Sequence, residues 1–145
     1  MPTSPTLAGG VAIRPLAVAD LDDLFDLRNR AFGPVSADAR SRANWQAEHE
    51  PDIPAGRYLG AFDGARLVAA ARFHDMTQWW RGRGVPMAGV ASVAVAPEER
   101  GRGVGRALVT GLLDLIDARG YPLATLYPST LPIYRSRGWE IAGTS

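Results

Sequence analysis

The spacing of apolar residues changes several times along the chain, and each change predicts a new element. A short apolar run predicts a strand at residues 11–15. Asp20 is a good N-cap for a helix over residues 20–31, in which one face is shared by Leu21, Leu24, Phe25 and Arg28. Ser36 can cap a second, more polar helix that continues to residue 50. The first third of the chain is therefore expected to hold one strand and two helices.

A strand-like pattern replaces the helical one after the second helix. Two apolar runs, at residues 58–62 and 67–73, flank the dipeptide Asp63-Gly64. This dipeptide is a preferred tight-turn pair between apolar runs, so the segment predicts a β-hairpin. The loop that follows is expected to hold Trp79 and Trp80.

The second half of the chain begins with a nearly continuous apolar run at residues 85–96. Such a run predicts a strand buried on both faces, at the centre of the sheet. Further along, the pattern predicts a helix at 104–119, a strand at 122–127, a short helix at 131–137 and a last strand at 139–142. This order of elements predicts the α/β class, with helices packed on one mixed sheet.

Composition fits one globular domain and removes several kinds of chemistry. The chain has 145 residues, of which 46% are hydrophobic, and its net charge is only +1. All 16 residues counted as Lys+Arg are arginine. Without lysine there is no Walker-A phosphate loop and no Schiff-base enzyme. Without cysteine there is no thiol catalysis and no thiolate metal site.

The distribution of charge and histidine narrows the kind of site further. Ten of the arginines but only six of the 15 acids lie in residues 64–145, so an anion site is expected in the second half. His49 and His74 lack helical metal-ligand spacing, and we expect no metal. Residues 1–10 do not have the pattern of a signal peptide, so we expect a cytoplasmic protein. We expect these residues to be a disordered tail. We expect no membrane partner, because no apolar run is long enough to span a bilayer.

A glycine-arginine turn follows the apolar run at residues 85–96. Glycines let backbone N–H groups approach a ligand, and the following helix offers unpaired donors at its positive end, so the turn suits a phosphate. The spacing of Gly101, Gly103 and Gly105 does not fit the dinucleotide fingerprint G-x-G-x-x-G. The structural alternative is a tight turn that serves only to pack the helix closely on the sheet.

The spacing Arg100-x-x-Gly103-x-Gly105 resembles the R/Q-x-x-G-x-G/A pyrophosphate loop of the GNAT superfamily of N-acetyltransferases. Residues 122–129 and 133–139 also resemble the corresponding region of enhanced-intracellular-survival-type enzymes, which acetylate aminoglycosides and other amines. The resemblance spans about residues 11–142. It implies a GNAT-like, mostly antiparallel sheet flanked by helices, with acetyl-CoA as co-substrate.

The resemblance also implies roles for individual residues. Val93 and Val95 would offer backbone groups to the pantetheine arm, and the pyrophosphate would be cradled by Arg100, Gly101, Gly103, Val104 and Gly105. Tyr134 would be the general acid, because a phenol is matched to a thiolate leaving group of similar basicity. The alternative for Tyr134 is a half-buried packing residue.

The acceptor is expected to be a primary amine of a small polyamine or an aminoglycoside-like molecule. Asp26 is the first candidate to bind it, and Trp45 is the second. Other acids near them, at positions 22, 23, 48 and 50, are typical of a solvated helix face. No general base is evident, because the apolar run at residues 85–96 offers Ser92 but no carboxylate.

Domain organisation and two other functions stay open at this point. Enhanced-intracellular-survival-type enzymes continue with further domains and deliver a distant C-terminal carboxylate to the site. We therefore expect residues 11–145 to be a GNAT domain from the N-terminal part of a longer protein, without the last strand of the fold. The other reading is an acetyl-CoA-binding module that lacks turnover. Arg-Gly-Arg-Gly occurs twice, which is too few for an RNA-binding tract, so we expect no nucleic acid. A homo-oligomer stays open.

Overall fold

The computed structural model describes residues 10–34 and 38–143. Its elements, in chain order, are β1 (Val11–Pro15), α1 (Leu21–Phe32), α2 (Ala39–His49), β2 (Tyr58–Asp63), β3 (Arg66–Trp80), β4 (Arg83–Val95), α3 (Val104–Ala118), β5 (Leu123–Thr125) and α4 (Pro132–Arg135). Short 3₁₀ turns precede α1, follow α2 and follow β4. The predicted cap Ser36 lies outside the described residues, and Asp38 caps α2 by accepting from the Ser41 backbone N–H at 2.7 Å.

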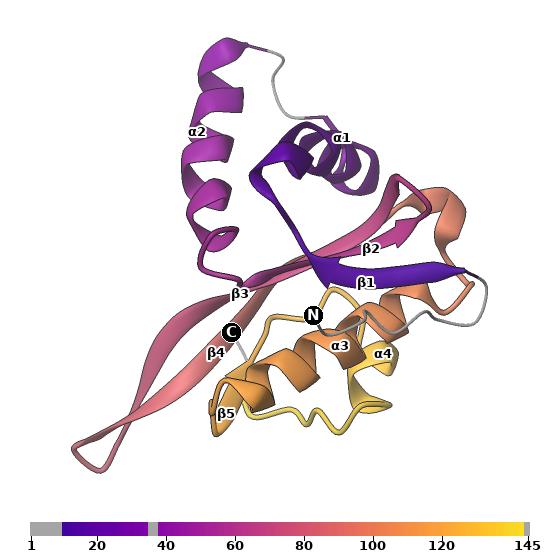
Figure 1. Ribbon diagram of the computed structural model, residues 1–145. Helices are drawn as coiled ribbons and strands as arrows, with labels where there is room; N and C mark the ends of the chain where they lie inside the picture. Colours follow the sequence, from indigo (N-terminus) through magenta and orange to yellow (C-terminus); the bar gives the residue numbers. More distant parts are fainter. Residues whose placement is uncertain (1–9, 35–37, 144–145) are drawn as a thin grey trace.

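The five strands form one sheet in the order β1-β2-β3-β4-β5. All neighbours are antiparallel except β4 and β5, which run parallel. Helices α1 and α2 lie on one side of this sheet, and α3 and α4 lie on the other (Figure 1). The predicted α/β class, a mostly antiparallel sheet flanked by helices, is confirmed.

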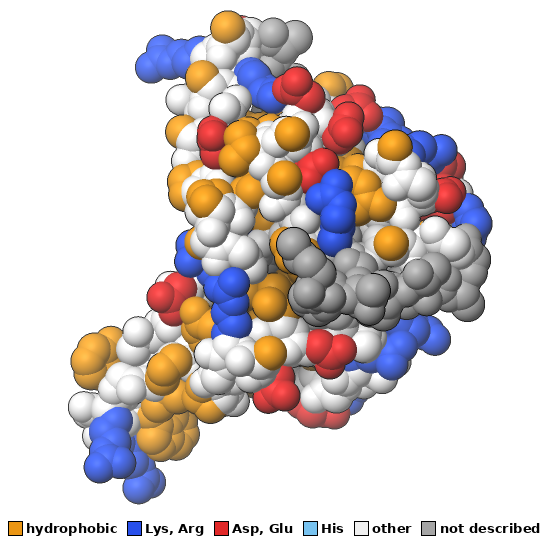
Figure 2. All heavy atoms as spheres, in the orientation of Figure 1, with side chains coloured by type: hydrophobic (Ala, Val, Ile, Leu, Met, Phe, Trp, Pro, Cys, Tyr) orange, Lys and Arg blue, Asp and Glu red, His pale blue; other side chains and the backbone are white. Residues whose placement is uncertain are grey.

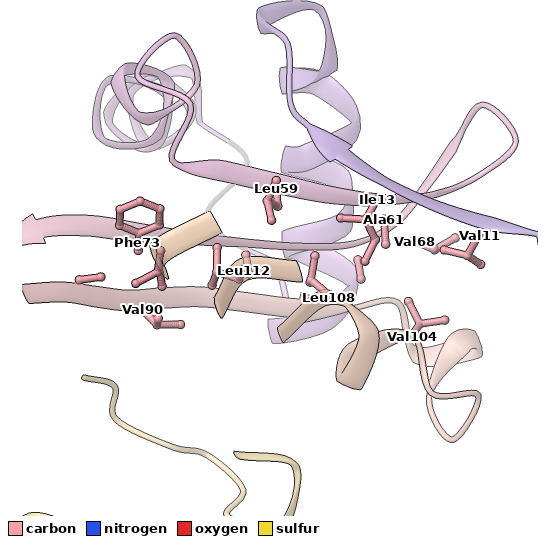
Figure 3. Packing of buried hydrophobic residues seen from close by; sticks show 14 residues of the cluster. Val11, Ile13, Leu59, Ala61, Val68, Phe73, Val90, Val104, Leu108 and Leu112 are labelled. Carbon is pink, nitrogen blue, oxygen red and sulfur yellow. The ribbon is translucent and has the colours of Figure 1, made fainter. Parts of the chain in front are cut away.

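Successive side chains along the strands point to opposite faces of the sheet, and a separate hydrophobic core lies on each face. On the α3 side, Leu108 and Leu112 are one helical turn apart and both almost fully buried, and they pack among residues that include Leu59, Val68 and Phe73 (Figure 3). On the α1 side the buried apolar residues include Leu24, Leu27, Trp45, Tyr58 and Phe62. Because β2 and β3 contribute to both cores, they hold the two helical layers in a fixed relation.

The β3–β4 hairpin corrects the predicted loop. Trp79 and Trp80 belong to β3, and Trp80 pairs directly with Arg83 across a two-residue turn. Arg81 and Gly82 both have positive φ, 48° and 76°, as a tight turn matched to the twist of the flanking strands requires. The strands therefore continue past the body of the molecule. Hydrophobic and arginine side chains gather on the end of this hairpin (Figure 2), where Trp79 is 69% exposed.

Two further expectations about the sheet are wrong. The central strand is β3 rather than β4, and burial on β4 is limited to residues such as Ala88, Val90 and Ala94. Residues 139–142 form no strand. Strand β5 is only three residues long and pairs only with β4, and Ile141 is exposed, so nothing in the described part of the chain holds residues 139–142 extended.

Candidate active site

The turn between β4 and α3 has the conformation that its glycines predict. Gly101 and Gly103 have φ values of 81° and 80°, and Gly103 is the N-cap of α3. A Cβ added at either position would meet no atom within 4 Å, so the turn is open on that side. The first backbone N–H groups of α3, beginning at Val104, have no partner within the helix. The turn therefore presents glycine backbone and free helix N–H groups to the same open space.

Two arginines of this turn are anchored to different parts of the fold. Arg102 pairs with the buried carboxylate of Glu99 at 2.6 Å. This ion pair joins the glycine turn to the 3₁₀ turn that precedes it. Arg100 donates to the Ala31 carbonyl at the end of α1, 3.3 Å away. Within the described residues each of these contacts uses a single guanidinium nitrogen, so both arginines keep further donors for a ligand. An anion that enters the turn meets positive charge as well as backbone N–H groups.

Strand β4 separates from β5 before it reaches the turn. Strand β5 pairs only with Met87–Gly89, so Val93 and Val95 lie in a stretch with no described strand on that side. A bulge lies in the same stretch, since Ser92 and Val93 together oppose a single residue, Ala71. Ser92 has a φ of 53°, which is rare for a residue with a side chain. Backbone groups at this edge are available to a ligand.

Tyr134 is buried on α4, near the start of α3. Its ring makes an edge contact with the Trp139 ring, with centroids 6.1 Å apart. The neighbouring Ile133 packs over Gly105, where an added Cβ would lie 3.3 Å from Ile133 Cδ1. Burial raises the pKa of the Tyr134 phenol, which keeps the hydroxyl protonated at neutral pH. Tyr134 also lines a cavity of about 730 Å³ beside β5.

On the opposite side of the sheet, a second cavity of about 490 Å³ lies between α1, α2 and β4. Trp45, the second candidate for the acceptor, lines this cavity and stacks on His49 with ring centroids 4.7 Å apart. Burial and the Arg72 charge lower the pKa of His49 to about 4, so this imidazole is neutral at pH 7. Burial also raises the pKa of Tyr58, whose hydroxyl lies 3.0 Å from His49 Nδ1. The complete lining is Leu24, Arg28, Phe32, Ser41, Asn44, Trp45, Glu48, His49, Tyr58, Ser92 and Ala94.

Sequence reasoning missed the charged cluster behind this cavity. Arg72 is only 2% exposed. It pairs with Glu48 at 2.7 Å and with the buried Asp52 at 3.1 Å, and Asp52 also pairs with Arg57 at 2.7 Å. The one signal in the sequence is an arginine inside the apolar run 67–73, because a buried charge needs a partner. That signal indicates a partner without saying where it lies.

Asp26, the first candidate for the acceptor, is not in this cavity. It is 68% exposed and pairs with Arg30 on its own helix at 2.9 Å. It lines a separate hollow with Arg66 and Glu98. The structure thus brings Trp45 and Glu48 together and leaves Asp26 apart from both.

The described residues contain no group of three or more His, Cys, Asp or Glu side chains that could hold a metal ion. None of the helices in residues 10–34 and 38–143 has the length and apolar character needed to cross a membrane.

Residues 12–142 match the acetyltransferase (GNAT) domain family, and the chain belongs to that family. An N-acetyltransferase of Streptomyces avermitilis is 36% identical over 130 residues, which are 89% of this chain and 31% of that protein. The N-acetyltransferase Eis of Mycobacterium tuberculosis is 40% identical over 114 residues, which are 78% of this chain and 27% of that protein. The crystal structure of a GCN5-related N-acetyltransferase from Kribbella flavida has a TM-score of 0.84 and 44% identity, covering 88% of this chain and 32% of that one. The chain therefore spans less than a third of the length of these relatives.

Proposed function

We propose that this domain is an acetyl-CoA-dependent N-acetyltransferase that moves an acetyl group to a primary amine of a small molecule by direct attack. One observation carries the proposal: an open turn with left-handed Gly101 and Gly103 at the N-terminus of α3 continues an unpaired edge of β4. GNAT enzymes use acetyl-CoA, which supplies an acetyl thioester and a long arm that ends in phosphates. The turn suits the phosphates and the strand edge suits the arm.

The chain's own residues have distinct tasks in this proposal. Gly101, Gly103, Val104 and Gly105 bind the pyrophosphate through backbone N–H groups, and Arg100 adds charge. Val93 and Val95 hold the arm through the free edge of β4. Tyr134 holds a proton at its hydroxyl oxygen and gives it to the departing thiolate, a task for which its raised pKa keeps it ready.

The cavity lined by Trp45 and Glu48 is the proposed acceptor site, because it reaches the bulge of β4 at Ser92 from the other side of the sheet. Polyamines and aminoglycosides follow from the resemblance to enhanced-intracellular-survival-type enzymes, so both belong in a test panel. Asp26 stays a prediction with weaker support, since it lies in a different hollow.

Calorimetry with acetyl-CoA, combined with a thiol-release assay on a panel of small amines, tests the proposal. We expect both cofactor binding and release of CoA thiol with at least one amine. Binding without release would support the alternative of an acetyl-CoA-binding module that lacks turnover. Absence of acetyl-CoA binding would overturn both readings.

A further inference from the structure

The charges around the acceptor cavity do not favour a polycation. Arg28 and Glu48 line the cavity. Behind them, Arg72 contacts Glu48, and both Arg72 and Arg57 pair with Asp52. Three arginines thus face two carboxylates across this region, and an acceptor with several ammonium groups would add like charge to it.

His49, which lines the same cavity, is influenced by the charged groups of both signs around it. Burial is the main cause of its lowered pKa, and the charge of Arg72 is the second. Arg28 acts in the same direction, while Glu48 and Asp52 act against it. Arg28 is therefore near enough to influence a charge within the cavity, although it lies on α1 and His49 lies on α2.

Glu48 is positioned to receive one ammonium group. Its Oε1 accepts from Arg72 Nη2 at 2.7 Å, and no described residue donates to Oε2. The side chain is 66% exposed and lines the cavity. A carboxylate held by a buried arginine is pre-oriented, which reduces the entropy lost on binding.

Arg28 is positioned to receive an anion. Its Nη1 donates to Asn29 Oδ1 at 3.1 Å and to the Gly33 carbonyl at 2.9 Å, which fixes the guanidinium. No ion pair in residues 10–34 and 38–143 includes Arg28, and none of its hydrogen bonds in that part of the chain uses Nε or Nη2. These two nitrogens present parallel donors that match a carboxylate. Leu24 and Trp45 also line the cavity and give it apolar surface.

We propose that the acceptor is a monoamine that also carries a carboxylate on an apolar body, with Glu48 binding the amine and Arg28 binding the carboxylate. The inference rests on the proposed function, because it assigns the acceptor of that reaction. It places the substrate among amino-carboxylates rather than among polyamines or aminoglycosides.

Three candidate acceptors test the proposed amino-carboxylate specificity: two share a body and differ in one carboxylate, and the third carries several positive charges. Phenylalanine has both groups, 2-phenylethylamine has the same body without the carboxylate, and spermidine is a polycation. Thiol release gives kcat/KM, and calorimetry on the chain saturated with CoA gives acceptor affinity without turnover. We expect phenylalanine to exceed 2-phenylethylamine at least about tenfold in both measurements, since a charge-assisted hydrogen bond is lost without the carboxylate, and we expect spermidine to be the weakest.

Variants separate a specific role for Arg28 from a structural one. Arg28→Met should reduce kcat/KM and affinity for phenylalanine to the values for 2-phenylethylamine. Arg28→Lys, which keeps the charge, should retain part of the preference for phenylalanine. Arg40→Met removes an exposed arginine of α2 outside the cavity and should leave the preference unchanged. Glu48→Gln should weaken the binding of both phenylalanine and 2-phenylethylamine.

The outcomes distinguish this inference from the proposed function. Thiol release with equal use of phenylalanine and 2-phenylethylamine, or with a preference for spermidine, overturns the inference and leaves the acetyltransferase standing. Selective binding of phenylalanine without thiol release from any amine overturns the acetyltransferase, and the acceptor assignment with it, and leaves only an amino-carboxylate binding site at Glu48 and Arg28. No binding of any of the three acceptors overturns the inference as well.

Discussion

Arg72 donates through Nε to Ser92 Oγ at 3.2 Å, and this contact joins the buried charges to the bulge of β4. Ser92 has a left-handed backbone, which a serine adopts only where its surroundings favour it. The guanidinium reaches Glu48 and Asp52 with its other nitrogens. One side chain therefore links α2, the turn after it, and the strand that separates the two halves of the proposed site.

Replacing Arg72 should destabilise the protein strongly. Arg72→Leu removes the buried partner of the Asp52 carboxylate and leaves it with the partly exposed Arg57 and with His74 at 3.9 Å, so the free energy of unfolding should fall by about 3–5 kcal/mol. Urea denaturation measures this. Arg66→Leu is the matched control, because its pair with Glu98 is half exposed and Glu99, which it contacts at 3.5 Å, keeps its closer partner Arg102, so the loss should be much smaller. Equal losses in the two variants would contradict the structural role of Arg72.

Tyr134→Phe should separate catalysis from cofactor binding. The variant keeps the ring contact with Trp139 and removes only the hydroxyl. We expect kcat to fall roughly 10²–10⁴-fold, with little change in acetyl-CoA affinity. Tyr127→Phe, at a side chain that is 93% exposed, is the control and should match the wild type. Unaltered turnover in Tyr134→Phe would remove this tyrosine from the mechanism.

The left-handed glycines permit a paired test of the turn. Gly103→Ala and Gly82→Ala each place a Cβ at a φ near 80°, in open space, so each should cost about 1–2 kcal/mol of stability. Only Gly103 caps the helix that is proposed to bind phosphate. Acetyl-CoA affinity measured by calorimetry should therefore fall in Gly103→Ala and stay unchanged in Gly82→Ala. The same affinity in both variants would count against the turn as the cofactor site.

Stability should decline as the pH falls from about 6.5 to about 4. The pKa of His49 is lowered to about 4 in the folded chain, whereas an unfolded histidine takes up its proton near 6.5. The unfolded state then binds more protons in this window, so the full stability is present above it and is lost on acidification. Urea midpoints between pH 4 and 7.5 measure the slope. His49→Gln should flatten this slope, and a slope unchanged in His49→Gln would refute the assignment.

Much of the fold could be predicted because the deciding signals are local. Asp63-Gly64 between two apolar runs predicted the hairpin, which forms with Asp63 opposite Arg66. Gly101 and Gly103 have positive φ, as expected of glycine, which adopts this conformation without the steric cost that a side chain brings. The strand that holds Trp79 and Trp80 lacks such a signal, because residues 74–80 show no alternation of apolar and polar positions.

The proposed acceptor site could not be predicted in the same way. Arg72 is 24 residues from Glu48 and 20 from Asp52, and no local pattern specifies contacts over such separations. Helical spacing, however, contained one usable signal. Arg28 shares a face of α1 with the buried Leu24, and both line the cavity between α1, α2 and β4. Asp26 lies on the solvent side of the same helix.

The four tryptophans are distributed so that the protein carries its own optical reporters. Trp79 and Trp80, exposed at the hairpin tip, should dominate the long-wavelength part of the emission and respond to an added quencher. Trp45 lies in the proposed acceptor cavity and Trp139 against Tyr134, and the indole nitrogens of both are buried. A Trp79→Phe, Trp80→Phe double variant would leave one signal on each side of the sheet, so binding on either side could be followed without a label.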